Sequence, residues 1–217
     1  MDLLIDPLQK TVTDILVEQI RKEIIRGVYP PGSRLRLRDL ADRFNVSTMP
    51  IREALQLLES EGLATSEARK GFKVTELTPN ELQDIYDMRA TLESMATRLA
   101  VPHISDEIIA AMREVIGKID AVQDDASLVV ELNNDFHALI YTASGRTHLA
   151  SVINMLRHRV AHYFHNYMIE LGSHAQTDHL DIIQACQDRD AERAAEIMFG
   201  HIDRAGRAVV AHAQKSA

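Results

Sequence analysis

The sequence predicts a mainly α-helical protein: an N-terminal winged helix-turn-helix with a small β-hairpin wing, followed by an all-α bundle of six to seven helices. Three observations support this fold class. Apolar residues recur at a near-3.6 spacing through most of the chain, a pair of short alternating segments stands at residues 63–75, and the charge divides after Glu76. Residues 1–76 contain 12 Lys/Arg and 12 Asp/Glu, whereas residues 77–217 contain 12 and 20 and all ten histidines. We therefore expect two domains, 1–76 and 77–217, with different functions.

The composition of the whole chain restricts its class. Of the 217 residues, 46% are apolar, which is enough to build real cores. No apolar run approaches the roughly 18 residues that a membrane helix needs, and the opening MDLLIDPLQK is too short and too acidic for a secretory signal. The single cysteine, Cys186, excludes an internal disulfide and fits a reducing compartment. We expect a folded cytoplasmic protein that does not contact membranes.

The first domain begins with a predicted helix from about Pro7 to Arg26, with Asp6 as its N-cap and Gly27 as its stop. The run LRLRDLADRF then predicts a short helix. After a three-residue connection, another helix is predicted from about Thr48 to Ser60, capped by Ser47, and two short helices joined by a tight turn form a helix-turn-helix. The next run, LATSEARKGFKVT, alternates around a glycine-containing turn, which predicts a hairpin. Helix, helix-turn-helix and hairpin in this order make a winged helix.

Basic residues occupy exposed positions of this predicted winged helix. Such cations neutralise DNA phosphates while the recognition helix places side chains in the major groove. The alternative is an ordinary solvated charged surface, which we favour for Arg43 taken alone but not for the set as a whole. The set comprises Arg34, Arg36, Arg38, Arg43, Arg52, Arg69, Lys70 and Lys73.

The run PGSRLRLRDLADRFNVSTMPIREALQLLESEGL, followed by RKGFKV, resembles the DNA-binding domain of GntR-type bacterial transcription regulators. The resemblance covers about residues 8–75 and implies that this domain binds double-stranded operator DNA. The family usually has arginine at the position of Thr48. Threonine offers one hydrogen bond or contacts a thymine methyl, so the operator sequence stays open. By position, the resemblance implies DNA contacts from Arg38, Ser47, Thr48, Met49 and Arg52 and, in the wing, from Arg69, Lys70 and Gly71.

The second domain is predicted to begin at LTPNEL, where Thr78 caps a helix, Pro79 opens it and Glu81 completes a capping box. Helices follow with no competing strand pattern. They are predicted at 79–101, 105–121, 127–143, 147–170, 175–188 and 190–212. Antiparallel helices with short connections form a bundle, and facing helices build ligand and metal sites in the interior of such bundles.

Three histidines of this bundle are candidate metal ligands. His137 follows Asn133 by one helical turn, so the two side chains share a helix face, and His201 follows His179 by 22 residues. A single histidine on a half-apolar face is more often a satisfied structural group, so spacing alone leaves both interpretations open. A second set of histidines also has helical spacing, but the arginines beside it indicate a helix face that is partly exposed to solvent rather than a metal site. This second set is His158, His162 and His165.

The runs YDMRATLESMATRLA, NNDFHALIYTASG and DHLDIIQACQDRDAERAAEIMFGHI resemble the all-helical effector domain, or FCD domain, of the fatty-acid-regulator branch of the GntR family. Many members hold a divalent metal through one aspartate and three histidines, and the resemblance aligns Asn133, His137, His179 and His201 with these ligands. Three imidazoles suit zinc or nickel. An asparagine cancels none of the ion's charge, so we expect weaker metal binding and a small carboxylate effector that completes the coordination shell.

Arg89 is a candidate effector-binding residue. The family's equivalent arginine often faces the pocket, and a guanidinium matches a carboxylate with two hydrogen bonds. The alternative is a helix-surface pair with Glu93, four residues on. The sequence leaves the two interpretations open.

These features together predict a ligand-responsive transcription regulator, expected to act as a repressor and not as an enzyme. We expect a homodimer, because one winged helix reads only a half-site and two-fold symmetry doubles the contacts across a palindrome. One alternative is a metal sensor without an organic effector. Another is a metal-dependent hydrolase in which three histidines activate water, but no HExxH motif occurs and Asp135 points about 200° away from His137 on its helix.

Overall fold

The computed structural model describes residues 10–67, 70–122, 124–171 and 176–216. The chain forms two compact units, Met1–Glu76 and Leu77–Ala217, and each unit has its own hydrophobic core. The described residues are mainly helical, with one small antiparallel sheet in the first unit. The predicted fold class is therefore confirmed.

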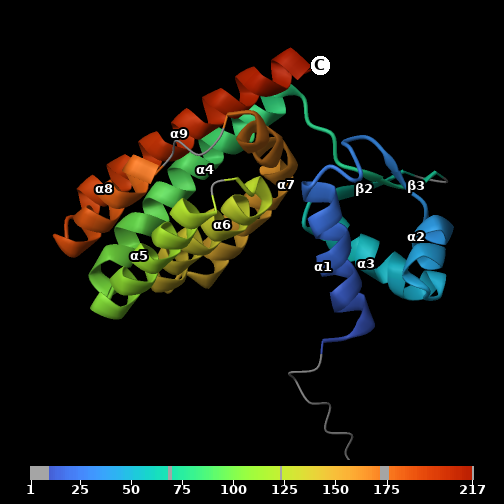
Figure 1. Cartoon of the computed structure of the whole chain (residues 1–217), viewed down its shortest axis with the longest axis horizontal. Coiled ribbons are helices and arrows are strands. Elements are labelled where there is room, and N and C mark those ends of the chain that lie inside the picture. The colour runs from blue at the N-terminus through green and yellow to red at the C-terminus, as the bar shows by residue number, and fades with distance from the viewer. Residues whose placement is uncertain (1–9, 68–69, 123, 172–175, 217) are drawn as a thin grey trace, which may run out of the picture. The chain divides into compact units, whose positions relative to one another are not determined.

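The first unit carries a helix-turn-helix and a three-stranded antiparallel sheet (Figure 1). Strand β3 lies between the other two and pairs with both. The expected hairpin is present as β2 and β3, but the sequence does not predict β1, because two residues are too few to show an alternating pattern. The elements in chain order are α1 (Val12–Ile25), β1 (Arg34–Leu35), α2 (Leu37–Phe44), α3 (Thr48–Ser60), β2 (Ala64–Glu67) and β3 (Gly71–Val74).

Helix α1 begins later than predicted. Its N-cap is Thr11, whose hydroxyl accepts the backbone N–H of Asp14 at 3.1 Å, while the Asp14 carboxylate accepts the backbone N–H of Thr11 at 2.9 Å. This reciprocal capping box satisfies backbone donors that would otherwise be unpaired. Lys10 and Thr11 are not helical, so one continuous helix from Pro7 is wrong. Asp6 lies outside the described residues.

The core of the first unit leaves one face of α3 open to solvent. Ile20 of α1 packs with Ile51 and Leu55 of α3, and all three side chains are fully buried. The buried residues of α3 recur at three- and four-residue intervals, so they occupy one helix face and the opposite face points outward.

The second unit is an all-helical bundle whose helices lie within a few residues of the predicted ranges. The Thr78 capping box is present as expected, and the break at Pro102 is a single 3-10 turn, η1 (Val101–His103). The last helix extends beyond its predicted end at residue 212. The α-helices are α4 (Pro79–Ala100), α5 (Asp106–Ala121), α6 (Ala126–Ala143), α7 (Thr147–Leu171), α8 (Gln176–Gln187) and α9 (Ala191–Ser216).

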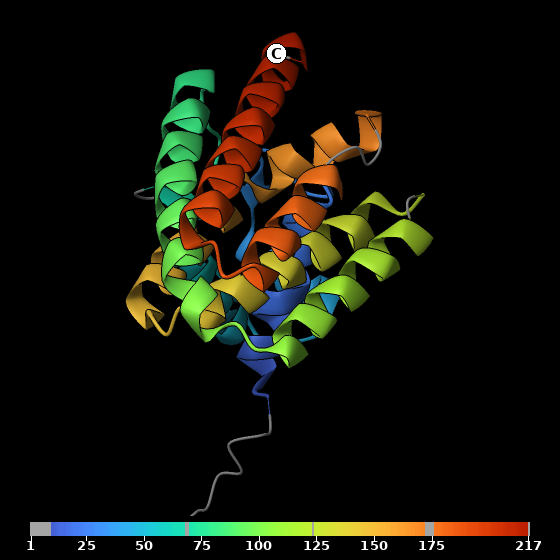
Figure 2. The same cartoon turned by 90° about the vertical axis from the view of Figure 1, so that its left-hand side faces the viewer.

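Helices α4 and α9 run beside each other for most of their length (Figures 1 and 2). Gly206 of α9 makes this approach possible. A Cβ atom at that position would lie 2.6 Å from the Cβ of Tyr86 on α4, which is far inside van der Waals contact. The absence of a side chain at Gly206 therefore sets the spacing of the two helices that carry Arg89 and His201.

None of the described helices has both the length and the apolar character that crossing a membrane requires.

Candidate effector and metal site

Three buried histidines converge from three helices in the interior of the bundle. His137 lies on α6, His179 on α8 and His201 on α9, and their side chains are 1%, 2% and 6% exposed. One possible ligand nitrogen of each lies within 4.8 Å of those of the other two. The structure thus brings together the three histidines that the sequence singled out, although they are separated by up to 64 residues.

Among the described residues, neither ring nitrogen of His179 has a hydrogen-bond partner, although both nitrogens are buried. A buried polar group without a partner costs free energy, so buried polar groups are nearly always bonded in native proteins. A metal ion would take up one of these nitrogens. With Zn–N bonds of about 2.0–2.1 Å, a tetrahedral ion needs its nitrogens roughly 3.4 Å apart, so the widest nitrogen pair would have to close by about 1.4 Å.

Burial favours the neutral imidazole in His137 and His179. Burial lowers the pKa of His137 well below its ordinary value, and the positive charge of Arg157 lowers it further. Burial, with the neighbouring His201, lowers the pKa of His179 to about 3. Metal ligation needs the unprotonated ring, so both side chains have the required protonation state at neutral pH.

The ring of His201 is oriented by an aspartate that the sequence analysis missed. Its Nδ1 lies 3.1 Å from the carboxylate of Asp178, which also accepts a 2.7 Å hydrogen bond from Arg204. The hydrogen bond from His201 is the main reason why the pKa of Asp178 is lowered. This contact leaves Nε2 of His201 for the centre of the triad. The only sequence signal was that Asp178 directly precedes His179.

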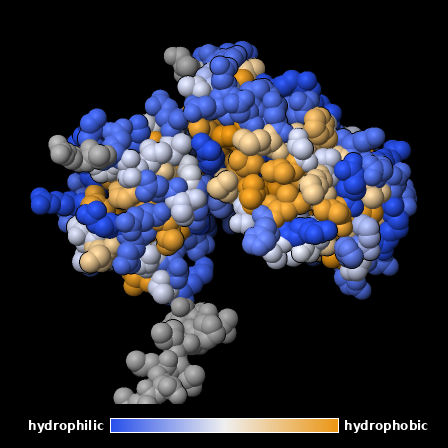
Figure 3. Space-filling view, turned by 180° about the vertical axis from the view of Figure 1, so that it is seen from behind, coloured by the Kyte–Doolittle hydropathy of each residue, from blue (hydrophilic) through white to orange (hydrophobic). Residues whose placement is uncertain are grey.

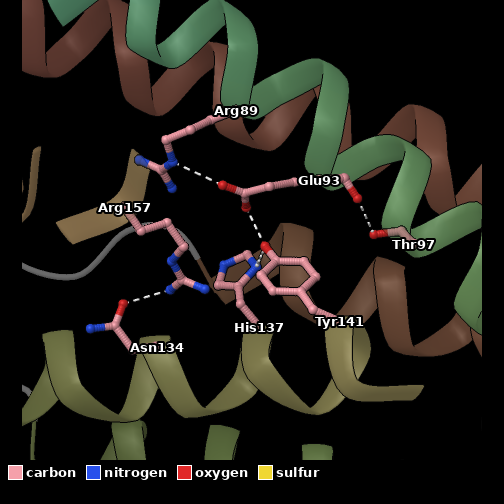
Figure 4. A network of polar contacts seen from close by, with 7 residues as sticks. All are labelled: Arg89, Glu93, Thr97, Asn134, His137, Tyr141 and Arg157. Carbon is pink, nitrogen blue, oxygen red and sulfur yellow. Dashed lines mark hydrogen bonds and ion pairs between the residues drawn. The ribbon is translucent and has the colours of Figure 1, made fainter. Parts of the chain in front are cut away.

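A buried chain of polar contacts orients His137 (Figure 4). The Tyr141 hydroxyl donates to the Glu93 carboxylate and lies 3.1 Å from Nδ1 of His137. Because Tyr141 has a single proton and gives it to Glu93, Nδ1 of His137 must be the donor in the second contact. Nε2 of His137 then carries the free lone pair that a metal requires. Glu93 in turn accepts a 2.8 Å hydrogen bond from Arg89.

Next to the triad lies a pocket of about 420 Å³, counting the space at its open mouth. Arg89 pairs with Glu93, but this pair is buried and not on the helix surface as the alternative interpretation expected, because Arg89 is 8% exposed and Glu93 fully buried. Arg89 also lines the pocket, and its contact with an effector stays a prediction. Asn133, one turn before His137, is half-buried and also lines it. The lining residues are Tyr86, Arg89, Val130, Asn133, Asn134, Arg157, Val160, Ala161, Phe164, His201 and Ala205.

Arg157 is a pocket residue that the sequence analysis misjudged. Arg157 is buried, with 8% of its surface exposed, and is not on a solvent-exposed face as predicted. It donates a 2.5 Å hydrogen bond to the side-chain oxygen of Asn134, and its guanidinium lies over the ring of Tyr141, 5.6 Å from the ring centroid. The prediction of a partly solvent-exposed helix face is also wrong for His162 and His165, which are 7% and 4% exposed. Neither belongs to the cluster of possible metal ligands found among the described residues.

In the first unit, four residues proposed to contact DNA line the start of α3. Ser47 occupies the predicted N-cap position, but its side chain makes no capping hydrogen bond. Thr48, Met49 and Arg52 follow it on the exposed face, and Met49 is 64% exposed. Gln56, which the sequence analysis did not select, is exposed one turn beyond Arg52.

Two acidic residues on the same helix as Arg52 are bonded to other partners. Glu53 accepts a hydrogen bond from Thr13, and Glu59 accepts two from Ser66. Within the described residues, no carboxylate lies within ion-pair distance of Arg52. Its charge is therefore available to a partner outside the chain.

The remaining residues proposed to contact DNA differ in how free they are to bind a partner outside the chain. Arg38 is exposed on α2 and Gly71 opens β3 with a positive φ of 85°. Lys70 lies 3.3 Å from the carboxylate of Glu67, while Arg69 lies outside the described residues.

Arg43 is not simply a solvent-exposed charge, because its guanidinium is bonded to other side chains of the first unit. Its guanidinium makes two hydrogen bonds of 2.7 and 2.9 Å to Glu23 and donates another to the Tyr29 hydroxyl. This side chain ties α2 to α1.

A winged helix-turn-helix followed by a helical bundle with an interior ligand pocket is the architecture of two-domain transcription regulators. Residues 13–74 match the family model described as bacterial regulatory proteins, gntR family, and residues 84–204 match the FCD domain. The chain belongs to the GntR family of transcription regulators and carries an FCD domain in its second half. The matched families and relatives are regulators, not enzymes.

Relatives and solved structures support this assignment. The Nta operon transcriptional regulator of Aminobacter aminovorans is 32% identical over 179 residues, which cover 81% of this chain and 84% of that protein. The HTH-type transcriptional repressor GlaR of Escherichia coli is 29% identical over 195 residues, which cover 84% and 89%. The structure of Escherichia coli McbR/YncC superposes with a TM-score of 0.82 over 95% of this chain and 100% of that one, at 23% identity, which shows that the fold is shared.

Proposed function

We propose that this regulator is an operator-binding repressor whose DNA affinity is controlled by a small carboxylate bound beside a divalent metal ion in the second unit. The observation that carries the proposal is the environment of the His179 ring. This ring is buried, neither ring nitrogen has a partner within the described part of the chain, and one nitrogen lies within 4.8 Å of a possible ligand nitrogen of each of two other histidines. Such an arrangement is costly without a ligand and natural with one.

Zinc or nickel fits a set of three imidazole ligands. His137, His179 and His201 would hold the ion, with Asn133 one turn from His137 as a weak fourth oxygen donor. When bound, the ion would supply positive charge that attracts an anionic ligand into the pocket. The chain's own residues would orient that ligand, with Arg89 as a donor to its carboxylate.

The exposed start of α3 is the surface that would enter the major groove. Thr48, Met49, Arg52 and Gln56 occupy the outward face of a helix whose other face is buried, which is how a recognition helix presents side chains to base edges. Arg38 and the wing, with Arg69, Lys70 and Gly71, would contact phosphates on either side. Such contacts position the protein and make its affinity depend on salt.

A homodimer would place two such surfaces on a palindromic operator. Several large apolar side chains of the second unit are exposed, and Figure 3 shows hydrophobic residues gathered on one of its faces. Exposed patches of this kind mark interaction surfaces. The exposed apolar residues of this unit are Met88, Met95, Leu128, Val152, Met155, Leu180 and Phe199.

Metal analysis of the purified chain tests the proposal. Protein dialysed against zinc should retain about one ion per chain, and the His179→Gln variant should lose it. Zinc at equal stoichiometry in both proteins would contradict the assignment. A metal sensor without an organic effector is the second candidate, and DNA binding that follows metal concentration but no acid would favour it.

A further inference from the structure

The pocket beside the triad contains a buried positive charge, that of Arg157, for which the described residues offer no ion-pair partner. Arg89 is neutralised by Glu93, with 2.8 Å between Nε and the carboxylate oxygen. Arg157 is equally buried, but its hydrogen-bond partner is the neutral amide of Asn134, and its other close neighbour is the ring of Tyr141. No ion pair joins Arg157 to any carboxylate among the described residues. Burying an unpaired charge is costly, so the pocket is electrostatically incomplete.

The charge balance of the pocket sets the charge of its ligand. Arg89 and Glu93 form an ion pair and cancel, and Asn133 contributes a neutral amide where a carboxylate would add a negative charge. Arg157 therefore adds one positive charge that no ion pair in the described part of the pocket cancels, and a divalent ion would add two more. With a divalent ion bound, a single carboxylate would offset one of these charges and a dianion two.

We infer that the ligand is a small dianion, such as a dicarboxylate, with one carboxylate directed to the histidine triad and the other held by Arg157. This inference rests on the proposed function and narrows it from carboxylates in general to those with two charges. The guanidinium groups of Arg89 and Arg157 both line the pocket and lie on the same side of the Tyr141 ring (Figure 4). Asn134 holds the guanidinium of Arg157 in place, so it is ordered before the ligand arrives.

The test uses matched pairs of acids with equal size and different charge. The dicarboxylates malonate, succinate, glutarate and adipate and their monoamides are titrated into the full-length chain by calorimetry, once after EDTA treatment and once with zinc. At least one dicarboxylate should bind about 10- to 100-fold more tightly than its monoamide, the range expected for one charge-assisted contact. Arg157→Gln should abolish this preference by weakening the dicarboxylate alone, and Arg157→Lys should keep part of it.

Arg98→Gln is the matched control, because it makes the same charge change on α4 in an exposed pair with Glu192 and should alter neither acid. Equal affinity of every dicarboxylate and its monoamide, no binding of any dicarboxylate, or an equal loss for both acids in Arg157→Gln would overturn the inference. Failure of the metal proposal gives a different result. The protein would then retain no zinc, while the Arg157-dependent preference persists.

Discussion

Replacing Tyr141 with phenylalanine removes one hydroxyl oxygen that makes hydrogen bonds to two side chains of the site. The Tyr141 hydroxyl donates to the fully buried Glu93 carboxylate and accepts from Nδ1 of His137. Without it, Glu93 keeps only its contact with Arg89, and the ring of His137 is free to change tautomer and orientation. Loss of a buried hydrogen bond to a charged group costs about 1.5–3 kcal/mol, and loss of a group that orients a metal ligand typically costs about 10- to 100-fold in metal affinity.

Zinc affinity of Tyr141→Phe is measured by competition with a chromogenic chelator, and stability by urea unfolding of the metal-free chain. Both should fall by the amounts given. Tyr163→Phe is the control, because its hydroxyl bonds the backbone of Leu77 and does not touch the triad, so only stability should decrease. Unchanged zinc affinity in Tyr141→Phe, or an equal loss of affinity in Tyr163→Phe, would refute the role given to this chain of contacts.

Three further predictions concern packing, pH and DNA. Gly206→Ala should destabilise the chain by about 1–3 kcal/mol in urea unfolding, because its Cβ would lie 2.6 Å from that of Tyr86, whereas Gly117→Ala, with nothing within 4 Å, should be neutral or stabilising. His179 has a folded pKa of about 3 against 6.5 in an unfolded chain, so the unfolded chain protonates first. As pH falls from 6.5 towards 3, the stability of the metal-free protein should drop by roughly 1.4 kcal/mol per unit from this residue. Unfolding curves at pH 7.5 and 5.5 should therefore show a smaller loss of stability in His179→Gln than in the wild type, because only the contribution of His137 remains in the variant. Arg38→Gln should weaken DNA binding and reduce the slope of log affinity against log salt by about 1, because Arg38 is assigned to a phosphate; an unchanged slope, measured by fluorescence anisotropy, would remove Arg38 from the phosphate contacts.

The sequence predicts those parts of the fold that depend on local pattern. Thr78 and Glu81 form a capping box whatever the helix packs against, and the helix ranges of the second unit follow from apolar periodicity and breaks. Helix α1 was placed too early because Asp6 and Pro7 mimic a start signal, whereas Thr11 and Asp14 make the actual cap. A strand as short as β1 is defined by its partner β3 and not by its own residues.

The sequence predicted the candidate metal ligands of the site but not the residues that surround them. His137, His179 and His201 were found through a family resemblance, and the structure brings them together. Glu93 and Tyr141 meet only because α4 and α6 pack against each other, so no spacing along the chain reveals them. Arg157 was misread because a charged residue beside histidines on one helix suggests solvent, whereas its burial depends on where α6 lies.

The central claim is that an acid bound at the histidine triad changes the affinity for DNA. The most direct measurement is the affinity of the zinc-loaded protein for the DNA upstream of its own gene, with and without saturating dicarboxylate, compared with His179→Gln. The account predicts that the acid weakens DNA binding in the zinc-loaded protein, that DNA weakens acid binding by the same factor, and that both effects vanish in His179→Gln. An acid response of equal size in His179→Gln would contradict it.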